Sequence, residues 1–400
     1  MLSSGFTREL RRFGDMELKR VREICFVTSS RADYGLLKPV MAAVRQHAAF
    51  RLRLIVTGTH LCEEHGSTIG AIESDGFSID ARVPMPLAGD TGADVCAAMG
   101  AVLKGVGAAF ERMRPDLVVV LGDRYEILAA ASAAAACRIP LAHLAGGDVT
   151  EGAVDELFRH AITKLANLHF VTNSDAGRRV LRMGEDPSRV HLVGSPGIDL
   201  IRATRTVSRR QFAAKTGYQF QPFNLLVTFH PTTGRPGAGA REIAGLLQAL
   251  DRPDTGILFT GVNADQERDV IERRIQDYCA SHPYAIYRAS LGAVLYFSAL
   301  RHFDAVVGNS SSGLYEAPSF GIPTVNIGDR QKGRLAADSV VHCAATRPAI
   351  SRALDAALAR DCSRVVNPYG DGHAAERCLA VLEQIEDFRT LSPKRFFENA

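Results

Sequence analysis

The chain has 400 residues, and at the usual domain size this length predicts two or three domains. A hydrophobic share of 46% and a charged share of 23% exclude a disordered tail, a collagen-like chain and a disulfide-dense mini-protein. The formal net charge of +3 and the absence of tryptophan give no support for nucleic acid or an anionic membrane surface as a partner.

Eight cysteines are spread along the chain without a C-x-x-C pair, which indicates reduced thiols in a reducing, cytoplasmic compartment. Residues 1–20 are basic and lack the apolar core of a signal peptide. We therefore expect a loose N-terminal extension, and either Met1 or Met16 could start the protein. No run of about 18 consecutive apolar residues predicts a transmembrane helix.

Short apolar runs rich in β-branched residues alternate with helical patterns along the whole chain. In the first half we expect strands at Ile24–Thr28, Leu52–Thr57, Leu117–Leu121, Ile139–Leu144, His169–Thr172 and Val190–Val193. In the second half we expect them at Leu225–Phe229, Ile257–Thr260, Ala285–Arg288, Ala305–Val307, Thr324–Ile327 and Val340–His342. Helices are expected at Leu36–His47, Thr91–Met113, Tyr125–Cys137, Glu156–Ala166, Glu242–Leu250 and Gln266–Cys279. This alternation predicts parallel α/β layers.

The alternation pauses between Ser195 and Pro222, where we expect a turn at Pro196-Gly197 and then a basic loop. The predicted fold class is α/β, with two Rossmann-like doubly wound domains facing a central cleft, because ligands of such sheets bind beyond the carboxyl ends of the strands. The expected parts are the extension 1–20, the N-terminal domain 21–195, a linker 196–221, the C-terminal domain 222–372 and a final segment 373–400.

The first candidate site is the Ser-Ser-Arg-Ala-Asp-Tyr-Gly stretch after Ile24–Thr28. Small polar residues are expected to leave backbone N–H groups free at a helix start, and Arg31 adds a positive charge, which suits an anion such as a diphosphate. The stretch has neither the G-x-G-x-x-G nor the Walker pattern, so a dinucleotide or ATP is disfavoured. A capped helix with a surface arginine is the structural alternative.

Acidic residues follow two later strands of the first half. Asp123 and Arg124 come directly after Leu117–Leu121, which favours a working carboxylate, with a helix N-cap as the alternative. After Ile139–Leu144, a Gly-Gly pair that we interpret as flexible precedes a dense titratable group. This group consists of Asp148, Glu151, Asp155, Glu156, Arg159 and His160. It predicts a substrate loop, and the alternative is a solvated helix start with i,i+4 surface pairs such as Asp155–Arg159.

Polar residues follow two strands of the second half in the same way. His230 comes after Leu225–Phe229 and is a candidate acid, base or phosphate donor, although a lone histidine is often structural. Asn263 stands in the same relation to the strand Ile257–Thr260. If both strands are parallel, His230 and Asn263 lie at the same edge of the second sheet.

The strongest phosphate signal is the loop 308–313, before a helix expected to begin near Leu314. Its donors come from Ser310, Ser311, Ser312 and Gly313. Glu316, one turn into that helix, could accept from ribose hydroxyls, and Arg330 and Arg334 follow the next strand. Together these loops predict a nucleoside-diphosphate site, whereas a capped helix and a basic surface loop are the structural alternative.

These motifs, in this order, resemble those of the hydrolysing UDP-N-acetylglucosamine 2-epimerases of sialic-acid biosynthesis over about residues 22–385. The motifs are VTSSRADYG, VTGTHL, VLGDRYE, HLAGGDVTEGAVDELFRHAITKLANLHF, TFHPTT, NAD, GNSSSGLYEAPSFGIP and NIGDRQKGR. The resemblance implies a glycosyltransferase-B type of two-domain fold, with UDP held mainly by the C-terminal domain. It also implies a homodimer and a final helix, expected near 373–388, that crosses back to the first domain.

The reaction that the resemblance implies converts UDP-N-acetylglucosamine and water into UDP and N-acetylmannosamine. UDP is expelled from carbon 1 as the proton on carbon 2 leaves, and water then adds across the resulting glycal with the opposite configuration. Acid–base groups around the sugar and positive charge on the diphosphate suffice for this, so no metal or other cofactor is expected. The UDP-sugar is the only partner expected beyond a second copy of the chain.

Residue by residue, the resemblance places Asp123, Asp155 and His230 at catalytic positions, with His230 acting on the diphosphate as an alternative. It places Arg31, Arg124, Asn263, Ser310, Ser311, Glu316 and Arg330 around the nucleotide. One position departs from the pattern, because some relatives carry Glu in a His-x-Glu-Gly-Gly motif where this chain has Ala145. The role of that glutamate must be absent or must pass to Asp148 or Glu151.

Several alternatives stay open at this point. The same chemistry on UDP-N,N′-diacetylbacillosamine, leading to legionaminic acid, fits the motifs equally well. A non-hydrolysing 2-epimerase typically shows Gly-His-Arg-Arg-Glu where this chain has Phe-His-Pro-Thr-Thr. A glycosyltransferase, or a sugar-nucleotide sensor without catalytic activity, would use the same fold for a different task.

Overall fold

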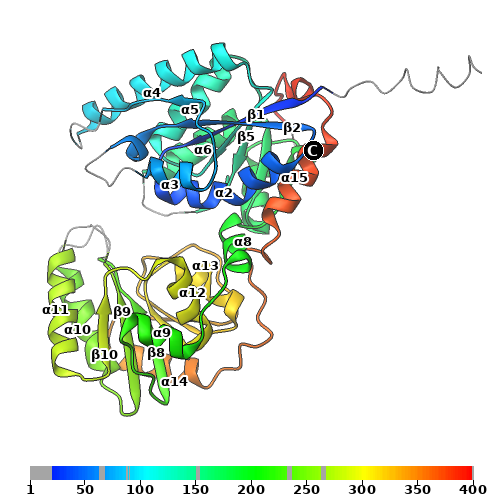
Figure 1. Ribbon diagram of the computed structural model, residues 1–400. Coiled ribbons are helices and arrows are strands. Elements are labelled where there is room, and N and C mark those ends of the chain that lie inside the picture. Colours follow the sequence, from blue (N-terminus) through cyan, green and yellow to red (C-terminus); the bar gives the residue numbers. More distant parts are fainter. Residues whose placement is uncertain are drawn as a thin grey trace, which may run out of the picture.

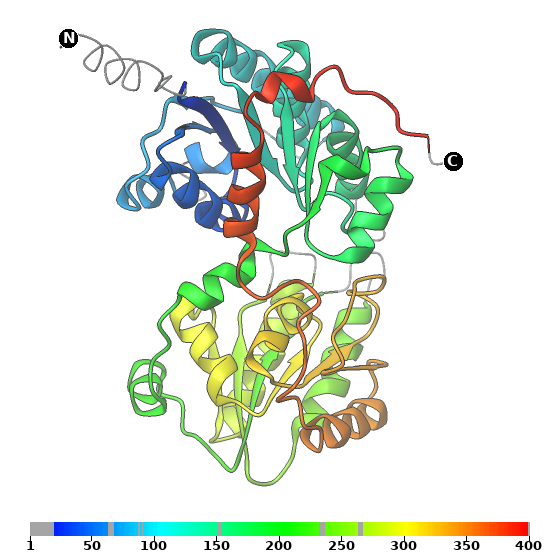
Figure 2. The ribbon, with the colours of Figure 1, turned by 90° about the vertical axis from the view of Figure 1, so that its right-hand side faces the viewer.

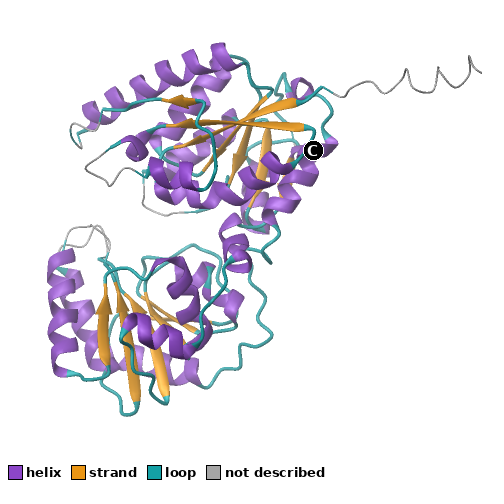
Figure 3. Cartoon of the chain, in the orientation of Figure 1, coloured by secondary structure: helices purple, strands orange, loops and turns teal. Residues whose placement is uncertain are grey.

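The computed structural model describes residues 20–62, 68–86, 89, 91–149, 154–231, 237–262 and 267–398. Two of the predicted site residues, Glu151 and Asn263, lie outside the described residues, as does nearly all of the expected extension 1–20. The described chain forms two lobes, each a sheet with helices on both faces (Figures 1 and 3).

The first lobe is built on a seven-stranded parallel sheet in the order β3-β2-β1-β4-β5-β6-β7. Its strands are β1 (Arg22–Thr28), β2 (Phe50–Val56), β3 (Ala81–Arg82), β4 (Leu117–Leu121), β5 (Leu141–Leu144), β6 (Leu168–Val171) and β7 (Val190–Leu192). Its helices are α2 (Arg31–Gln46), α3 (Ile69–Ser74), α4 (Gly92–Met113), α5 (Tyr125–Ala136), α6 (Asp155–Leu165) and α7 (Ser174–Arg182). In the centre, Phe26 of β1 lies beside Leu54 of β2 and Val119 of β4, and all three are buried because helices cover both faces.

The second lobe contains a six-stranded parallel sheet in the order β10-β9-β8-β11-β12-β13. Its strands are β8 (Phe223–Thr228), β9 (Thr255–Thr260), β10 (Ala285–Arg288), β11 (Ala305–Gly308), β12 (Thr324–Ile327) and β13 (Val340–Cys343). Its helices are α10 (Ala238–Leu250), α11 (Arg268–Ser281), α12 (Gly292–His302), α13 (Ser312–Tyr315) and α14 (Arg347–Leu358). The predicted class, two doubly wound parallel α/β sheets, is confirmed, and each predicted strand matches an observed one to within two residues at either end.

Strand order in both sheets reverses at one point, between β1 and β4 in the first sheet and between β8 and β11 in the second. Loops on opposite sides of such a reversal diverge and leave room for a ligand beyond the carboxyl ends of the strands. Asp123 follows β4 and His230 follows β8, so sequence-predicted site residues stand at both reversals.

The chain passes between the lobes twice, and the two crossings touch each other (Figure 2). The first crossing leads into α8 (Pro196–Ala203) and α9 (Arg209–Thr216), and the second leads into α15 (Ala374–Gln384). Asp199 of α8 accepts hydrogen bonds from the N–H groups of Ala374 and Ala375, at 2.9 and 2.7 Å, and so caps α15. Ala375, Cys378 and Leu382 of α15 join the core beneath the first sheet.

The expected turn at Pro196-Gly197 is wrong, because these two residues begin α8. Proline suits the first helical position, since its missing N–H has no intrahelical partner there, and the Ser195 hydroxyl accepts from the N–H of Gly197 at 3.3 Å. The segment expected as a linker therefore contains two helices. Further helices without a counterpart in the sequence analysis are α3, α7, α12 and α14, and short 3-10 helices lie at Gly58–Leu61, Pro187–Arg189, Ala317–Phe320 and Phe388–Leu391.

Helix α4 is, among the described residues, the one helix long and apolar enough to cross a membrane by length and composition alone. The sequence analysis expected none. Val102, Val106 and Phe110 recur on one face of α4 and are buried in a core shared with the first sheet and α5. Packing within the lobe accounts for this apolar face.

A buried histidine links the elements that hold the acidic loops. Nε2 of His143, on β5, donates to the carbonyl of Gly122 at 2.8 Å, and Nδ1 lies 3.2 Å from the hydroxyl of Thr163 on α6. Burial lowers the pKa of His143 to about 3, so the ring is neutral and Nδ1 is the acceptor. The ring therefore connects β4, β5 and α6 through one fixed tautomer.

Gly308 closes β11 in a backbone conformation that other residues cannot adopt. Its φ is 138°, and a Cβ atom built on it would lie 1.8 Å from the carbonyl oxygen of Thr228 on β8. This close approach brings the loops after β8 and β11 side by side.

Replacing Gly308 by alanine should lower the free energy of unfolding by at least about 2 kcal/mol, since both strain and overlap are introduced. Urea titration measures the change. Gly100→Ala, at an exposed position of α4 with nothing within 4 Å of the new Cβ, is the control and should raise stability by about 0.5 to 1 kcal/mol. A Gly308 variant as stable as the wild type would contradict the geometry.

The His143 ring should remain neutral, with its proton on Nε2, from pH 7 to pH 5. The ring binds a proton in the unfolded chain near its ordinary pKa of 6.5 but not in the folded chain until about pH 3. Because the unfolded chain binds this proton first, the free energy of unfolding should decrease as the pH falls from 6.5 to about 3. Histidine ¹⁵N NMR of the folded protein, with the urea-unfolded chain as the control, measures both states. Titration near pH 6.5 in the folded protein would disprove the assignment.

Candidate active site

Arg159 of α6 joins the two acidic loops of the first lobe. Its Nη2 forms an ion pair with the Asp123 carboxylate, and its Nη1 donates to the Asp148 carbonyl at 2.7 Å. The Arg159 side chain is only 4% exposed. The sequence analysis placed Arg159 in the titratable group of the predicted substrate loop, with a surface pair with Asp155 as the alternative, but did not name it as a site residue. Its burial and its pairing with Asp123 are visible only in the structure.

Asp155, the first residue of α6, lies close to Asp123. Burial raises the pKa of Asp155, and the charge of the Asp123 carboxylate raises it further, while Arg124 and Arg159 oppose the shift. Two neighbouring carboxyl groups in different surroundings are suited to opposite protonation states, one as a base and one as an acid.

Asp148 is the acidic residue that faces the other lobe. Its Oδ1 accepts from the Thr172 hydroxyl at 2.6 Å and from Nδ2 of Asn173 at 3.2 Å. Burial raises the pKa of Asp148, against the opposing effects of the Thr172 hydrogen bond and of arginines that include Arg334 from the second lobe. The two lobes therefore interact electrostatically at Asp148.

The Gly-Gly pair before Asp148 is tightly packed, and its interpretation as flexible is wrong. A Cβ on Gly146 would lie 2.9 Å from His143 Nδ1 and from Thr163 Oγ1. A Cβ on Gly147, whose φ is +77°, would lie 2.4 Å from the Ala176 carbonyl oxygen. Both glycines are needed because the loop after β5 lies directly against its neighbours.

The loop after β1 does not leave its backbone amides free, contrary to the sequence analysis. The Asp33 carboxylate accepts from the N–H groups of Ser29 and Ser30, both at 2.9 Å, and from the hydroxyls of Thr28 and Ser29, both at 2.8 Å. An internal anion thus occupies this helix start. The side chain of Arg31 is the positive charge that the loop presents at its exposed surface.

Arg124 is oriented by a buried carboxylate that the sequence analysis did not single out. Its Nε donates to Oε1 of Glu126 at 2.5 Å, and the Glu126 side chain is fully buried. Oε2 of Glu126 has no hydrogen-bond partner among the described residues. The Arg124 side chain as a whole stays 42% exposed, so it can still contact a ligand.

Asn309 fastens three strand ends of the second lobe together. Its side chain accepts from the N–H of His230 at 2.7 Å and donates to the His230 carbonyl at 2.8 Å. Its own carbonyl accepts from Nε2 of Gln331 at 2.8 Å and from Nη1 of Arg330 at 3.4 Å. Asn309 is buried and was missed, because the loop sequence draws attention to the serines that follow it.

The helix after the serine loop begins two residues before the predicted start at Leu314 and ends before Glu316, which was expected one turn inside it. Helix α13 has four residues, Ser312–Tyr315, and gives way to a 3-10 turn containing Pro318, whose missing N–H cannot extend an α-helix. The Tyr296 hydroxyl donates to Ser312 Oγ at 2.5 Å, and Ser312 in turn hydrogen-bonds the Glu316 carboxylate. Ser312 is thus hydrogen-bonded to two side chains, and the neighbouring Ser310 and Ser311 are half-buried.

Glu316 offers an acceptor without a protein partner. Burial raises its pKa, and Oε2 is buried without a hydrogen bond among the described residues. Nearby, Ser310 and Ser312 line a cavity of about 370 Å³ together with the ends of β8 and β9 and the segment 289–293. Glu316 itself is not part of the cavity wall, and Ser312 stands between the two.

Arg334 extends the basic loop after β12 toward the first lobe. Its Nη1 donates to Gln331 Oε1 at 2.8 Å, and its guanidinium lies 5.7 Å from the centre of the Tyr315 ring. Tyr315 in turn stacks on Tyr369 with ring centres 3.8 Å apart. These contacts hold the Arg334 charge where it acts on Asp148.

A separate cavity of about 790 Å³ lies at the junction of the lobes, and its wall includes Thr172, Ile198, Pro318 and Val366. None of the predicted site residues within the described part of the chain lines it. Thr172 connects it to the site, because its hydroxyl donates to Asp148. Among the residues that the structure describes, no three His, Cys, Asp or Glu side chains are grouped as metal ligands.

Comparison with known proteins identifies relatives along most of the chain. A family model described as UDP-N-acetylglucosamine 2-epimerase matches residues 42–383. The hydrolysing UDP-N,N′-diacetylbacillosamine 2-epimerase of Legionella pneumophila is 36% identical over 365 residues, which cover 91% of this chain and 96% of that protein. The hydrolysing GDP/UDP-N,N′-diacetylbacillosamine 2-epimerase of Campylobacter jejuni is 36% identical over 323 residues, 80% of this chain and 84% of that protein. The polysialic acid biosynthesis protein P7 of Escherichia coli is 32% identical over 384 residues, 94% of this chain and 98% of that protein.

Solved structures share the fold. A UDP-N-acetylglucosamine 2-epimerase structure from Listeria monocytogenes, described as putative, superposes with a TM-score of 0.76 at 18% identity and covers 95% of this chain and 99% of its own. The enzyme from Neisseria meningitidis bound to UDP-GlcNAc gives a TM-score of 0.73 at 18% identity, with 90% and 100% covered. The family model spans most of the chain, and the relatives above 30% identity include two hydrolysing enzymes. The chain therefore belongs to the hydrolysing UDP-N-acetylglucosamine 2-epimerase family.

Proposed function

We propose that the chain hydrolyses a UDP-linked 2-acetamido sugar with inversion at carbon 2, releasing UDP and the free 2-epimer. One observation carries the proposal. The paired carboxyl groups Asp123 and Asp155 lie in the lobe whose Asp148 interacts with Arg334 of the other lobe. A sugar between the lobes would then have acid–base groups on one side and positive charge for its diphosphate on the other.

The acidic side supports the chemistry at carbon 2. In the first step, a carboxylate takes the proton from carbon 2 while the bond from carbon 1 to the UDP oxygen breaks, which leaves a glycal. In the second, water adds its hydroxyl to carbon 1, and an acid returns a proton to carbon 2 on the opposite face. We assign the base to Asp123, which Arg159 orients, and the acid to Asp155, whose pKa is raised.

Asp148 takes the place of the glutamate that some relatives carry at Ala145. It lies three residues further along the same loop, and burial raises its pKa, which favours a proton donor. Glu151, the other candidate, lies outside the described residues and stays a prediction. Asp148 would therefore share the acid role with Asp155 around the sugar.

The second lobe supports a nucleoside diphosphate. Arg330 and the hydroxyls of Ser310 and Ser311 would face the phosphates, with His230 held beside them by Asn309. The cavity of about 370 Å³ next to Ser310 would take the base, and the unpartnered oxygen of Glu316 would accept from ribose. The remaining predicted contacts are Arg31 and Arg124 from the first lobe and Ser312, Gly313, Asn263 and Arg334 from the second.

Two sugars are candidates for the substrate. The motifs and the family model support UDP-N-acetylglucosamine, with nonulosonic (sialic) acid synthesis as the destination of the product. The names of two relatives at 36% identity support UDP-N,N′-diacetylbacillosamine, and one of those names includes the GDP derivative. A cytoplasmic homodimer remains the prediction that the cysteine pattern and the resemblance give.

A product assay decides among these activities. The protein is incubated in D₂O with UDP-N-acetylglucosamine and with the UDP and GDP forms of N,N′-diacetylbacillosamine, and NMR follows the products. We expect free nucleoside diphosphate, a 2-epimerised free sugar and one deuterium at carbon 2, from one of these substrates. A nucleotide-linked epimer would instead indicate the non-hydrolysing reaction. Nucleotide release with carbon 2 unchanged would indicate a transferase, and binding without turnover a sensor.

Two substitutions should separate chemistry from binding. Asp123→Asn should lower kcat by at least about 100-fold, because it removes the proposed base, while the Kd for UDP changes less than about twofold.

Arg330→Ala should instead affect binding. It should raise the Kd for UDP about 10-fold or more, because a charged contact to the diphosphate is lost. Calorimetry with UDP and initial rates measure both parameters. Near-normal kcat in Asp123→Asn would remove that residue from the mechanism.

A further inference from the structure

The last residues of the chain are fastened to the first lobe. After α15 the chain makes a 3-10 turn at Phe388–Leu391 and then runs along that lobe (Figure 2). The Leu391 carbonyl accepts from Nδ2 of Asn167 at 3.1 Å and from Nη1 of Arg189 at 2.6 Å. Further along, the N–H of Phe397 donates to the Gly184 carbonyl at 2.9 Å. The described end of the final segment 373–400, beyond the expected helix, is therefore packed against the first lobe.

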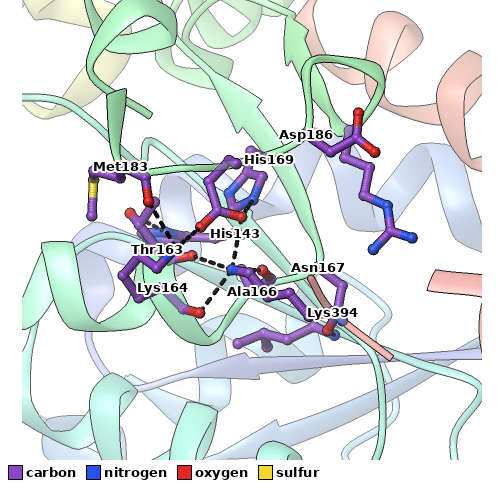
Figure 4. A network of polar contacts seen from close by, with 12 residues as sticks. His143, Thr163, Lys164, Ala166, Asn167, His169, Met183, Asp186 and Lys394 are labelled. Atoms are coloured by element: carbon purple, nitrogen blue, oxygen red, sulfur yellow. Dashed lines mark hydrogen bonds and ion pairs between the residues drawn. The ribbon is translucent and has the colours of Figure 1, made fainter. Parts of the chain in front are cut away.

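Lys394 is the centre of this attachment, and Figure 4 shows it pointing at the end of α6. Its ammonium donates to the carbonyls of Lys164 and Ala166 at 2.7 and 2.6 Å, and it lies 2.7 Å from Oε2 of Glu185. The two carbonyls belong to the last turn of α6 and to its C-cap, where backbone acceptors lack intrahelical donors. A cation at this end also interacts favourably with the helix dipole.

Helix α6 is the element on which the acidic half of the site depends. Its first residue is Asp155, and one turn further Arg159 holds the Asp123 carboxylate and the Asp148 carbonyl. One more turn along, Thr163 contacts His143, which supports the backbone just before Asp123. The position of the whole helix therefore sets where these acidic groups stand.

We propose that Lys394 is a positioning residue for the reaction, because it anchors the carboxyl end of α6 and so aligns Asp155 and Arg159 with Asp123. Its effect passes through the helix, about two turns from the reacting groups, and it touches no predicted ligand. This inference rests on the proposed function, since it concerns the acid–base step. The phosphate contacts proposed for the second lobe, Ser310, Ser311 and Arg330, are not among the contacts of Lys394.

The test compares Lys394→Met with Lys394→Arg, and with Arg395→Met as the matched control. Arg395 is an exposed cation one residue further along the same tail. We expect Lys394→Met to lower kcat about 10-fold, while KM and the Kd for UDP change less than twofold. Lys394→Arg can donate to the same carbonyls and should restore most of kcat, and Arg395→Met should match the wild type. Lys394→Gln, an uncharged donor, should give an intermediate kcat and provides a second variant.

Backbone hydrogen exchange of α6 in the same proteins measures the anchoring without turnover. Exchange should be about 10-fold faster in Lys394→Met and close to wild type in Lys394→Arg and Arg395→Met. Unchanged α6 exchange in Lys394→Met, or a parallel loss of kcat and UDP binding there, would overturn the inference. A wild type that converts none of the three sugar nucleotides overturns the proposed function instead, whatever the exchange of α6 shows.

Discussion

The buried guanidinium of Arg159 determines how the acidic half of the site is built. It binds a carboxylate after β4 and a carbonyl after β5, so two loops that follow separate strands are held by one side chain. A buried charge of this kind needs its partners, because removing either would leave an uncompensated charge in the interior. The loops after β4 and β5 and the start of α6 are therefore one cooperative unit.

In the second lobe, a neutral side chain rather than a charged one holds the loops together. Asn309 uses its amide and its own carbonyl to join the loops after β8, β11 and β12, and a tight glycine contact at Gly308 brings the first two together. An amide can hold these loops without adding charge beside the arginines. The carboxyl groups of Asp123, Asp148 and Asp155 thus stand in the first lobe, and Arg330 and Arg334 stand in the second.

Much of the fold could be predicted from the sequence, because buried parallel strands read as continuous apolar runs and their periodicity is local. Strand order is different: the reversals beside β1 and β8 depend on crossovers that local patterns do not encode. Helix α8 was missed because Pro196-Gly197 resembles a turn until the proline is seen at a first helical position. Glu316 was expected one turn inside a helix but stands at the end of α13, where Pro318 follows in a 3-10 turn.

The candidate site shows the same limit. Sequence patterns indicated acids and cations at strand ends, since those groups stand in short, polar, glycine-rich loops. They could not indicate that the Asp33 carboxylate accepts hydrogen bonds from the backbone N–H groups after β1. They also could not indicate that Arg159 forms its ion pair with Asp123 rather than with Asp155, which is nearer in the sequence. Both depend on three-dimensional neighbours, and the second crosses 36 positions of the chain.

The contact between the two crossings has a mechanical consequence. Asp199 binds the start of α15, and the Ser195 N–H donates to the Tyr369 carbonyl at 2.7 Å. A Cβ atom on Gly194 would lie 3.3 Å from the Cα of Gly370, so there is little room for a side chain between the passages. Two passages that could each bend independently are thus bonded at one place. Rotation of one lobe against the other is therefore restrained at this place, because neither passage can bend there without moving the other.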